Sequence, residues 1–231
     1  MSRSPARTAS KTSTWIVAAA VGVVVLGALA VVLASRSTPS SPATVEFSEV
    51  TTTGSALPAL PADGTVDPAV GANLPTISGT SFDGSPVTID PNDGMAKLIV
   101  LVAHWCPHCQ REIPALSQFY ADNQLPPGSE MYIVSTKADR GAPNWPASAW
   151  LEEYPIRGAT VMADSQGGDA AASLGLAGFP MFLIVDGEGR VVYRFAGEAA
   201  PSQVNELLAA VAAGEVKTPS SVTSGPASST S

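Results

Sequence analysis

Runs of apolar residues along the middle of the chain predict a set of buried strands. Residues 97–105 (KLIVLVAHW) are almost continuously apolar and contain β-branched side chains, a pattern typical of a central strand covered on both faces. Residues 130–136 and 159–164 show a similar pattern and predict two more strands. Two pairs of short apolar runs, each pair interrupted by turn glycines, predict β-hairpins over residues 80–90 and 181–197.

Helices are predicted between these strands. From Cys109 to about residue 123 the apolar residues repeat at helical spacing, although Pro114 is expected to kink this helix. Short helices are predicted over residues 145–154 and 169–176, and an amphipathic helix over residues 202–214. The resulting order, β-α-β-α-β-α-β-β-α, predicts an α/β domain with a central mixed sheet and helices on both faces.

The N-terminal region has a different pattern. Residues 15–34 carry no charge and are about as long as a helix that crosses a bilayer, roughly 20 residues. Three basic residues and no acidic residue precede this run, so the positive-inside bias places residues 1–14 in the cytoplasm and the rest of the chain outside. The alternative is a signal peptide cleaved after the small-residue motif at residues 32–34. We favour an uncleaved transmembrane anchor in the cell membrane, with a secreted domain as the alternative.

Two segments of low complexity flank the predicted domain. Residues 35–73 are rich in Ser, Thr, Pro and Ala without a sustained period, which predicts an extended linker. Within it, residues 44–50 (TVEFSEV) alternate and indicate a possible short strand. Residues 216–231 are expected to be a disordered tail. This leaves residues 74–215 as a folded domain of ordinary size.

Composition narrows the chemistry. The net charge of −8 leaves no basic face for a nucleic-acid backbone. The chain has only two cysteines and two histidines, and all four lie together as His104, Cys106, His108 and Cys109. At most one disulfide can form, so a disulfide scaffold is excluded. Such a concentration indicates chemistry, a metal site or a small structural disulfide.

The position of the cysteines favours redox chemistry. Cys106 lies where the predicted strand ends and the helix begins, so backbone N–H groups and the helix dipole would stabilise its thiolate. Cys109 follows one helical turn later and could attack a mixed disulfide formed by Cys106. His108 would add positive charge, favour the reduced thiolate form and make the disulfide more oxidising.

The other interpretations are weaker. A structural disulfide across so small a loop would restrict the unfolded chain little. Copper(I) binding by Cys106, Cys109 and a histidine suits thiolate ligands, but neighbours on one strand–helix junction cannot easily surround an ion tetrahedrally. Covalent haem attachment requires a histidine where Gln110 stands. We therefore predict no metal and no bound cofactor.

A family resemblance starts from the motif WCPHC, residues 105–109. Followed by Glu112 and Pro114, it resembles the active site of thioredoxin-like proteins and is similar to the membrane-anchored TlpA/ResA-type thiol–disulfide oxidoreductases. The resemblance covers residues 74–215 and implies a thioredoxin-like fold, with Cys106 and Cys109 as the redox-active pair. Thioredoxin-like proteins also place a cis-proline opposite the cysteines, and Phe179-Pro180 occupies the matching position before a predicted strand.

The resemblance also implies the roles of the neighbouring residues. Trp105, Pro107, His108, Phe179 and Pro180 are expected to form the substrate-binding surface. The dipeptide Pro107-His108 is the one found in oxidising DsbA-type enzymes, whereas the spacing between the motif and Pro180 fits the reductase branch. The direction of electron flow therefore stays open, and a DsbA-like oxidase and a copper-binding thioredoxin-fold chaperone are the alternatives.

Glu112 is the expected proton carrier. Classical thioredoxins have a buried aspartate where Val100 stands here, and TlpA/ResA-type proteins keep a functional glutamate at the position of Glu112. Burial beside a thiol should raise the pKa of this carboxyl. The alternative is a solvated glutamate paired with Arg111.

The implied partners are cysteines of exported proteins, including apocytochrome c, and a membrane thiol-redox transporter that supplies electrons. No nucleic-acid partner is expected. Membrane association would come from the N-terminal helix.

Overall fold

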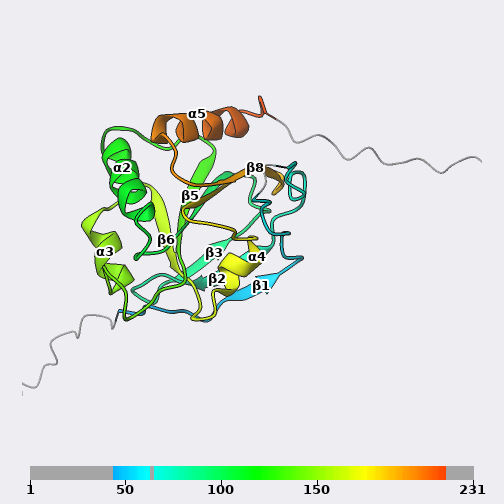
Figure 1. The fold of residues 1–231 in the computed structure, drawn as a ribbon. Helices are drawn as coiled ribbons and strands as arrows, with labels where there is room; N and C mark the ends of the chain where they lie inside the picture. Colours follow the sequence, from blue (N-terminus) through cyan, green and yellow to red (C-terminus); the bar gives the residue numbers. More distant parts are fainter. Residues whose placement is uncertain (1–43, 63–64, 217–231) are drawn as a thin grey trace, which may run out of the picture. The chain divides into compact units, whose positions relative to one another are not determined.

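The computed structural model describes residues 44–62 and 65–216, which form one central sheet with helices packed against it (Figure 1). The strands are β1 (Thr51–Thr53), β2 (Thr76–Thr80), β3 (Pro86–Ile89), β4 (Ala96–Val102), β5 (Ser129–Ser135), β6 (Ala159–Ala163), β7 (Met181–Val185) and β8 (Val191–Ala196). The helices are α2 (Cys109–Asp122), α3 (Ala147–Glu153), α4 (Asp169–Ser173) and α5 (Pro201–Ala212).

The sheet is mixed, as the order of elements predicts. Its strands follow the order β1-β2-β6-β5-β4-β7-β8, with β3 paired to β2. The central strand β4 runs parallel to β5 and antiparallel to β7. All seven residues of β4 are buried, because both its edges are paired and both its faces are covered.

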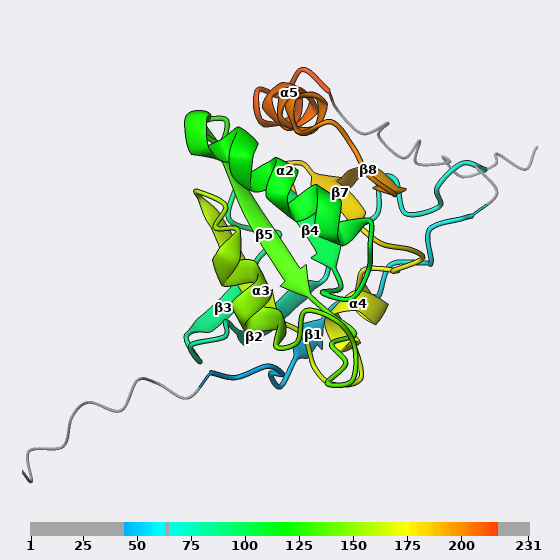
Figure 2. The same ribbon diagram turned by 60° about the vertical axis from the view of Figure 1, so that its left-hand side comes forward.

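The two faces of the sheet have separate cores. Leu98, Val100 and Val102 of β4 belong to the core shared with α2, α3 and α5, and Figure 2 shows these helices around β4 and β5. Ile99 and Leu101 belong to the opposite core, which α4, the β2–β3 hairpin and residues from the N-terminal segment complete. This alternation follows from the period of two in a β-strand.

The predicted elements agree closely with those of the structure. Helix α2 continues through Pro114 to Asp122 without interruption. The strand predicted over residues 97–105 ends earlier, at Val102, because the backbone turns before the cysteines.

The expectation of a strand over residues 44–50 is wrong. These residues do not form a strand; the edge strand β1 begins immediately after them, at Thr51. Their polar groups bind elsewhere: Ser48 N donates to the Asp164 carbonyl oxygen (3.1 Å), and Glu46 accepts from the backbone N–H of Ser148 at the start of α3 (3.2 Å).

Part of the predicted linker packs on the domain. Leu57 and Ala69 are buried in the core on the α4 face, and Asp67 forms an ion pair with Arg194 of β8 (2.5 Å). Structured residues therefore begin well before Leu74. The sequence conceals this because the segment contributes single apolar and charged side chains rather than a periodic element.

The terminal predictions lie outside the described residues. These include the membrane span at residues 15–34 and the tail from residue 217 onward. Within the residues that the structure describes, no helix has both the length and the apolar character needed to cross a bilayer.

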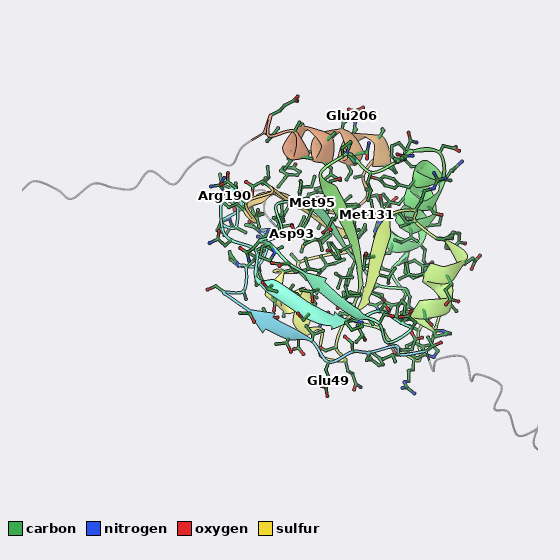
Figure 3. The ribbon with its side chains drawn as sticks, turned by 180° about the vertical axis from the view of Figure 1, so that it is seen from behind. Glu49, Asp93, Met95, Met131, Arg190 and Glu206 are labelled. Atoms are coloured by element: carbon green, nitrogen blue, oxygen red, sulfur yellow. The ribbon has the colours of Figure 1, made fainter. Side chains whose placement is uncertain are left out.

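A buried cation lies at the beginning of β4. Lys97 is fully buried, and its Nζ atom contacts Asp93 Oδ1 at 2.5 Å and the Met95 carbonyl oxygen at 3.1 Å. Figure 3 shows Asp93 and Met95 next to each other in this region. Because its charge is paired, Lys97 can occupy an otherwise apolar strand.

Candidate active site

Cys106 lies in the turn that joins β4 to α2, and Cys109 is the first residue of α2. Cys106 N donates to the Ala103 carbonyl oxygen (3.0 Å), and the Cys106 carbonyl oxygen accepts from Gln110 N (3.0 Å). Both thiols are free; Cys106 is 6% exposed and Cys109 is fully buried. Of the two cysteines, only Cys106 therefore keeps any exposure to solvent.

Burial raises the pKa of the Cys109 thiol well above its ordinary value, and the nearby Cys106 and Glu112 raise it further. A buried thiol of this kind is a poor nucleophile until a base removes its proton. The site therefore needs a proton acceptor on the buried side.

Glu112 lies in that position, one helical turn after Cys109, and is only 2% exposed. Its Oε2 atom accepts a hydrogen bond from the Ala199 backbone N–H (3.1 Å), while Oε1 has no partner. Burial, the largest cause, raises the pKa of this carboxyl above its ordinary value; the Ala199 N–H lowers it and the charge of Glu198 raises it. Glu112 is thus a buried acid rather than a solvated one.

Arg111, the alternative partner of Glu112, points elsewhere. Its guanidinium binds Glu198, which lies in the loop between β8 and α5 (Nη2–Oε1, 2.5 Å). His108 joins the same carboxylate, with Nδ1 2.6 Å from Oε1. Arg111 first and His108 second lower the pKa of Glu198 to about 2. The sequence analysis did not identify Glu198. It lies far along the chain from the cysteine motif, and its neighbours in the sequence form no motif that indicates a role at the site.

The predicted proline loop faces the first cysteine. The Phe179–Pro180 peptide bond is cis, and the Phe179 carbonyl oxygen is 4.0 Å from Cys106 Sγ. The rings of Trp105 and Phe179 pack edge to face with centroids 5.6 Å apart. The structure therefore brings Trp105, Phe179 and Pro180 together around Cys106.

The remaining residues of the WCPHC motif lie at the surface next to Cys106 or are held by the backbone. Pro107 and His108 are exposed beside Cys106. Trp105 is held by a hydrogen bond from its Nε1–H to the Lys137 carbonyl oxygen (2.8 Å). A surface of apolar rings beside an accessible sulfur suits contact with a peptide.

His104 does not belong to the reactive group. It is fully buried; its Nδ1 is 2.7 Å from the Pro143 carbonyl oxygen and its Nε2 accepts from Asp139 N (3.0 Å). These contacts fix the tautomer with the proton on Nδ1. Its role is to hold the loop after β5, which contains a second cis peptide bond, Trp145–Pro146, that the sequence did not predict.

Metal binding by His104 would require its side chain to move. Both nitrogens of His104 are bonded to the backbone, and His108 Nδ1 faces Glu198 and Arg111. Among the described residues, no three His, Cys, Asp or Glu side chains are grouped so that they could hold a metal ion.

The sequence of this chain is similar to those of known thiol–disulfide redox proteins. The Redoxin family matches residues 69–211. The thiol–disulfide oxidoreductase ResA of Bacillus cereus is 20% identical over 139 residues, covering 60% of this chain and 76% of the relative. A DsbE homologue of Paracoccus denitrificans, named a thiol:disulfide interchange protein, is 30% identical over 130 residues, covering 55% of this chain and 66% of the relative.

Solved structures support the thioredoxin-like α/β fold. A secreted thiol–disulfide isomerase from Corynebacterium glutamicum superposes with a TM-score of 0.54 at 18% identity, covering 69% of this chain and 99% of the other. A protein of Chlorobium tepidum described as thiol:disulfide interchange protein DsbE has a TM-score of 0.51 at 22% identity, covering 62% and 97%.

Proposed function

The chain belongs to the Redoxin family, and from this premise we propose that it exchanges disulfides with cysteines of other proteins through Cys106 and Cys109. It is a thiol–disulfide oxidoreductase of the ResA/DsbE type. The observation that carries the proposal is the free thiol pair at the start of α2, with the accessible Cys106 facing the carbonyl oxygen of Phe179. An accessible attacking thiol and a buried resolving thiol are the two parts that exchange requires.

In the reducing direction the reaction has two steps. The Cys106 thiolate attacks one sulfur of a client disulfide, forms a mixed disulfide and releases the other client sulfur as a thiolate. Cys109 then loses its proton and attacks Cys106 Sγ, which forms the internal disulfide and releases the second client thiolate. The client gains two electrons, the enzyme loses two, and a dithiol donor restores the enzyme.

Glu112 is the proposed proton acceptor for Cys109. The carboxylate is buried one turn away, and the unpartnered Oε1 is free to take a proton. Its raised pKa brings it closer to neutrality, where a general base works best. The same group can return the proton when the reaction runs in the oxidising direction.

The client is proposed to bind over Trp105, Pro107, His108 and the Phe179–Pro180 peptide. The rings of Trp105 and Phe179 provide an apolar surface, and the cis peptide places a carbonyl oxygen beside Cys106. Exported proteins such as apocytochrome c are the proposed clients, with electrons supplied by a membrane thiol-redox transporter. This assignment rests on the predicted anchor at residues 15–34, which would hold the domain outside the cytoplasm.

The opposite direction is a second candidate, because His108 stands between the two cysteines and favours the thiolate. A copper(I) chaperone is less well supported, since both nitrogens of His104 are bonded to the backbone and Nδ1 of His108 is engaged by Glu198.

The testing experiment uses the full chain in detergent and measures catalysed reduction of insulin disulfides by dithiothreitol, together with the equilibrium potential of the cysteine pair. Catalysis that disappears in Cys106→Ala is expected. A potential near or below that of thioredoxin, about −270 mV, would assign the reductase direction, and a much higher one the oxidase direction. Unchanged catalysis in Cys106→Ala would overturn the proposal. Stoichiometric uptake of copper(I) by the reduced chain without catalysis would favour the chaperone.

A further inference from the structure

We propose that Glu198 is a positioning residue that offsets the positive charge of the first turn of α2 and so makes the cysteine pair less oxidising than its Pro107-His108 dipeptide alone would make it. The inference rests on the proposed function, since it concerns the redox equilibrium of the same two cysteines. It bears on the conflict between an oxidase-type dipeptide and a reductase-type scaffold.

Geometry places Glu198 in a clamp with the side chains of Arg111 and His108. Arg111 donates to it through Nη2 (2.5 Å) and through Nε to both carboxylate oxygens (3.1 and 3.2 Å). His108 Nδ1 lies 2.6 Å from Oε1 and 2.8 Å from Arg111 Nη2. A fork contact of this kind restricts both partners more than a single contact does.

The loop that carries Glu198 contacts α2 a second time. The next residue, Ala199, donates its backbone N–H to the buried carboxylate of Glu112. Neighbouring residues of one loop thus bind the outer, charged side of the helix and its inner, catalytic side. The position of Glu198 is fixed by this second contact as well as by its own ion pairs.

Groups from several elements lie around Cys106. Arg111 and Glu112 come from α2 and His108 is the residue just before it; Glu198 comes from the loop before α5, and the carbonyl oxygen of Phe179 from the loop before β7. Arg111 is near enough to Cys106 for the two charges to interact. Without Glu198, the outward-facing guanidinium of Arg111 would stabilise the Cys106 thiolate, and hence the reduced form, without a counter-charge.

The expected size of the change in the thiol–disulfide equilibrium follows from the solvent exposure of the three side chains. His108, Arg111 and Glu198 side chains are 58%, 56% and 38% exposed, so water and salt screen their fields. Exposed pairs contribute little, and we expect about a three- to fivefold change in the thiol–disulfide equilibrium constant.

Glu198→Gln tests the inference because it removes the charge and keeps the size of the side chain. The full chain is equilibrated with reduced and oxidised glutathione, and the oxidised fraction is measured after acid quenching. The equilibrium constant for oxidation should fall about three- to fivefold, which raises the potential by about 15–20 mV.

Two controls separate a charge effect from a structural one. Glu206→Gln removes one negative charge from an exposed position on α5 (Figure 3) and should leave the equilibrium unchanged. In about 1 M salt the effect of Glu198→Gln should shrink, because the Debye length falls to about 3 Å. A shift that persists at high salt would point to altered backbone geometry and overturn the electrostatic account.

The possible outcomes keep this inference distinct from the proposed function. If the parent chain equilibrates with glutathione but Glu198→Gln matches Glu206→Gln, Glu198 has no such role and the proposed function stands. A lower potential in Glu198→Gln would also overturn the inference. If the parent chain neither equilibrates with glutathione nor reduces insulin, the proposed function itself fails.

Discussion

Glu112 and Ala199 are joined by a hydrogen bond of 3.1 Å from the Ala199 backbone N–H to Oε2. Among the residues that the structure describes, this bond is the one hydrogen bond to the carboxyl group of Glu112, a residue that is 2% exposed. The second oxygen, Oε1, has no partner. An ionised carboxylate in such a place destabilises the folded chain, because burial disfavours charge. The proposed proton acceptor is thus held at a cost in stability, as is common for catalytic groups.

Glu112→Gln should stabilise the fold at neutral and alkaline pH. The pKa of Glu112 is raised in the folded state, so the neutral carboxyl stabilises the fold relative to the ionised one. This contribution to the free energy of unfolding is fully present below the unfolded pKa, about 4.3, and is lost as pH rises through the folded pKa. Urea unfolding of both chains at several pH values measures this: the variant should be more stable above the folded pKa, and the two should converge in acid. A variant that is less stable than the parent chain at pH 8 would contradict the burial argument.

The same substitution should slow resolution of the mixed disulfide. Glutamine cannot accept the Cys109 proton, and general base catalysis contributes on the order of 10²-fold or more. Single-turnover mixing of reduced enzyme with a small disulfide, followed by Trp fluorescence, should show a normal first step and a slow second step. Equal second-step rates in the parent and the variant would remove Glu112 from the mechanism.

Cys109→Ala should trap mixed disulfides, because the first step remains and the resolving thiol is missing. Cys106→Ala should trap none, since the remaining thiol of Cys109 is fully buried. Non-reducing gels and mass spectrometry of complexes with a disulfide-containing client measure both. Adducts of comparable yield on Cys109 in the Cys106→Ala chain would show that the sulfurs exchange roles.

Local sequence patterns were sufficient to predict the strand–helix junction at the centre of the site. The apolar run before Cys106 and the helical spacing after Cys109 predict the strand–helix junction that the structure contains. The cis geometry at Phe179–Pro180 follows the resemblance rather than any physical property of the dipeptide. Burial of Glu112 was one of two open alternatives, and packing by the loop at Ala199 decides it.

Contacts between residues far apart in the chain could not be predicted from the sequence. Glu198 reaches His108 and Arg111 across roughly ninety residues, and an exposed glutamate after a strand gives no indication of its partner. Asp67 reaches Arg194 over an even longer separation, from a segment that lacks any period. Such contacts depend on where separate elements meet in space, which neither propensity nor spacing encodes.

His104→Ala should lower the free energy of unfolding strongly but change the rate of disulfide exchange little. The change would leave the Asp139 N–H and the Pro143 carbonyl oxygen without their partner and open a cavity, at a cost of about 2–4 kcal/mol in the free energy of unfolding. Urea unfolding checks the loss, and insulin reduction per folded molecule should stay within about threefold of the parent at a temperature where both are folded. A large drop in turnover with unchanged stability would instead give His104 a part in the reaction.

Asp67→Asn tests whether the segment before residue 74 belongs to the domain. Asp67 binds Arg194 through two hydrogen bonds (2.9 and 2.5 Å), and the Arg194 side chain is fully buried. Removing one partner of a buried pair leaves an uncompensated charge and costs about 3–5 kcal/mol in the free energy of unfolding. Urea unfolding at pH 7 should show this loss, whereas Glu49→Gln, at an exposed position of the same segment, should change little.

The pH dependence of that loss has a definite sign. Burial alone would raise the pKa of Asp67, but the hydrogen bonds from Arg194 and from the Ala69 N–H outweigh it and hold the pKa below its ordinary value. The ion pair therefore contributes stability above the unfolded pKa of about 3.9, and the contribution is lost as pH falls through the folded pKa. The difference between the parent and Asp67→Asn should accordingly be constant from pH 6 to 8 and shrink in acid. Equal stability at pH 7 would mean that the Asp67–Arg194 ion pair contributes nothing to the stability of the fold.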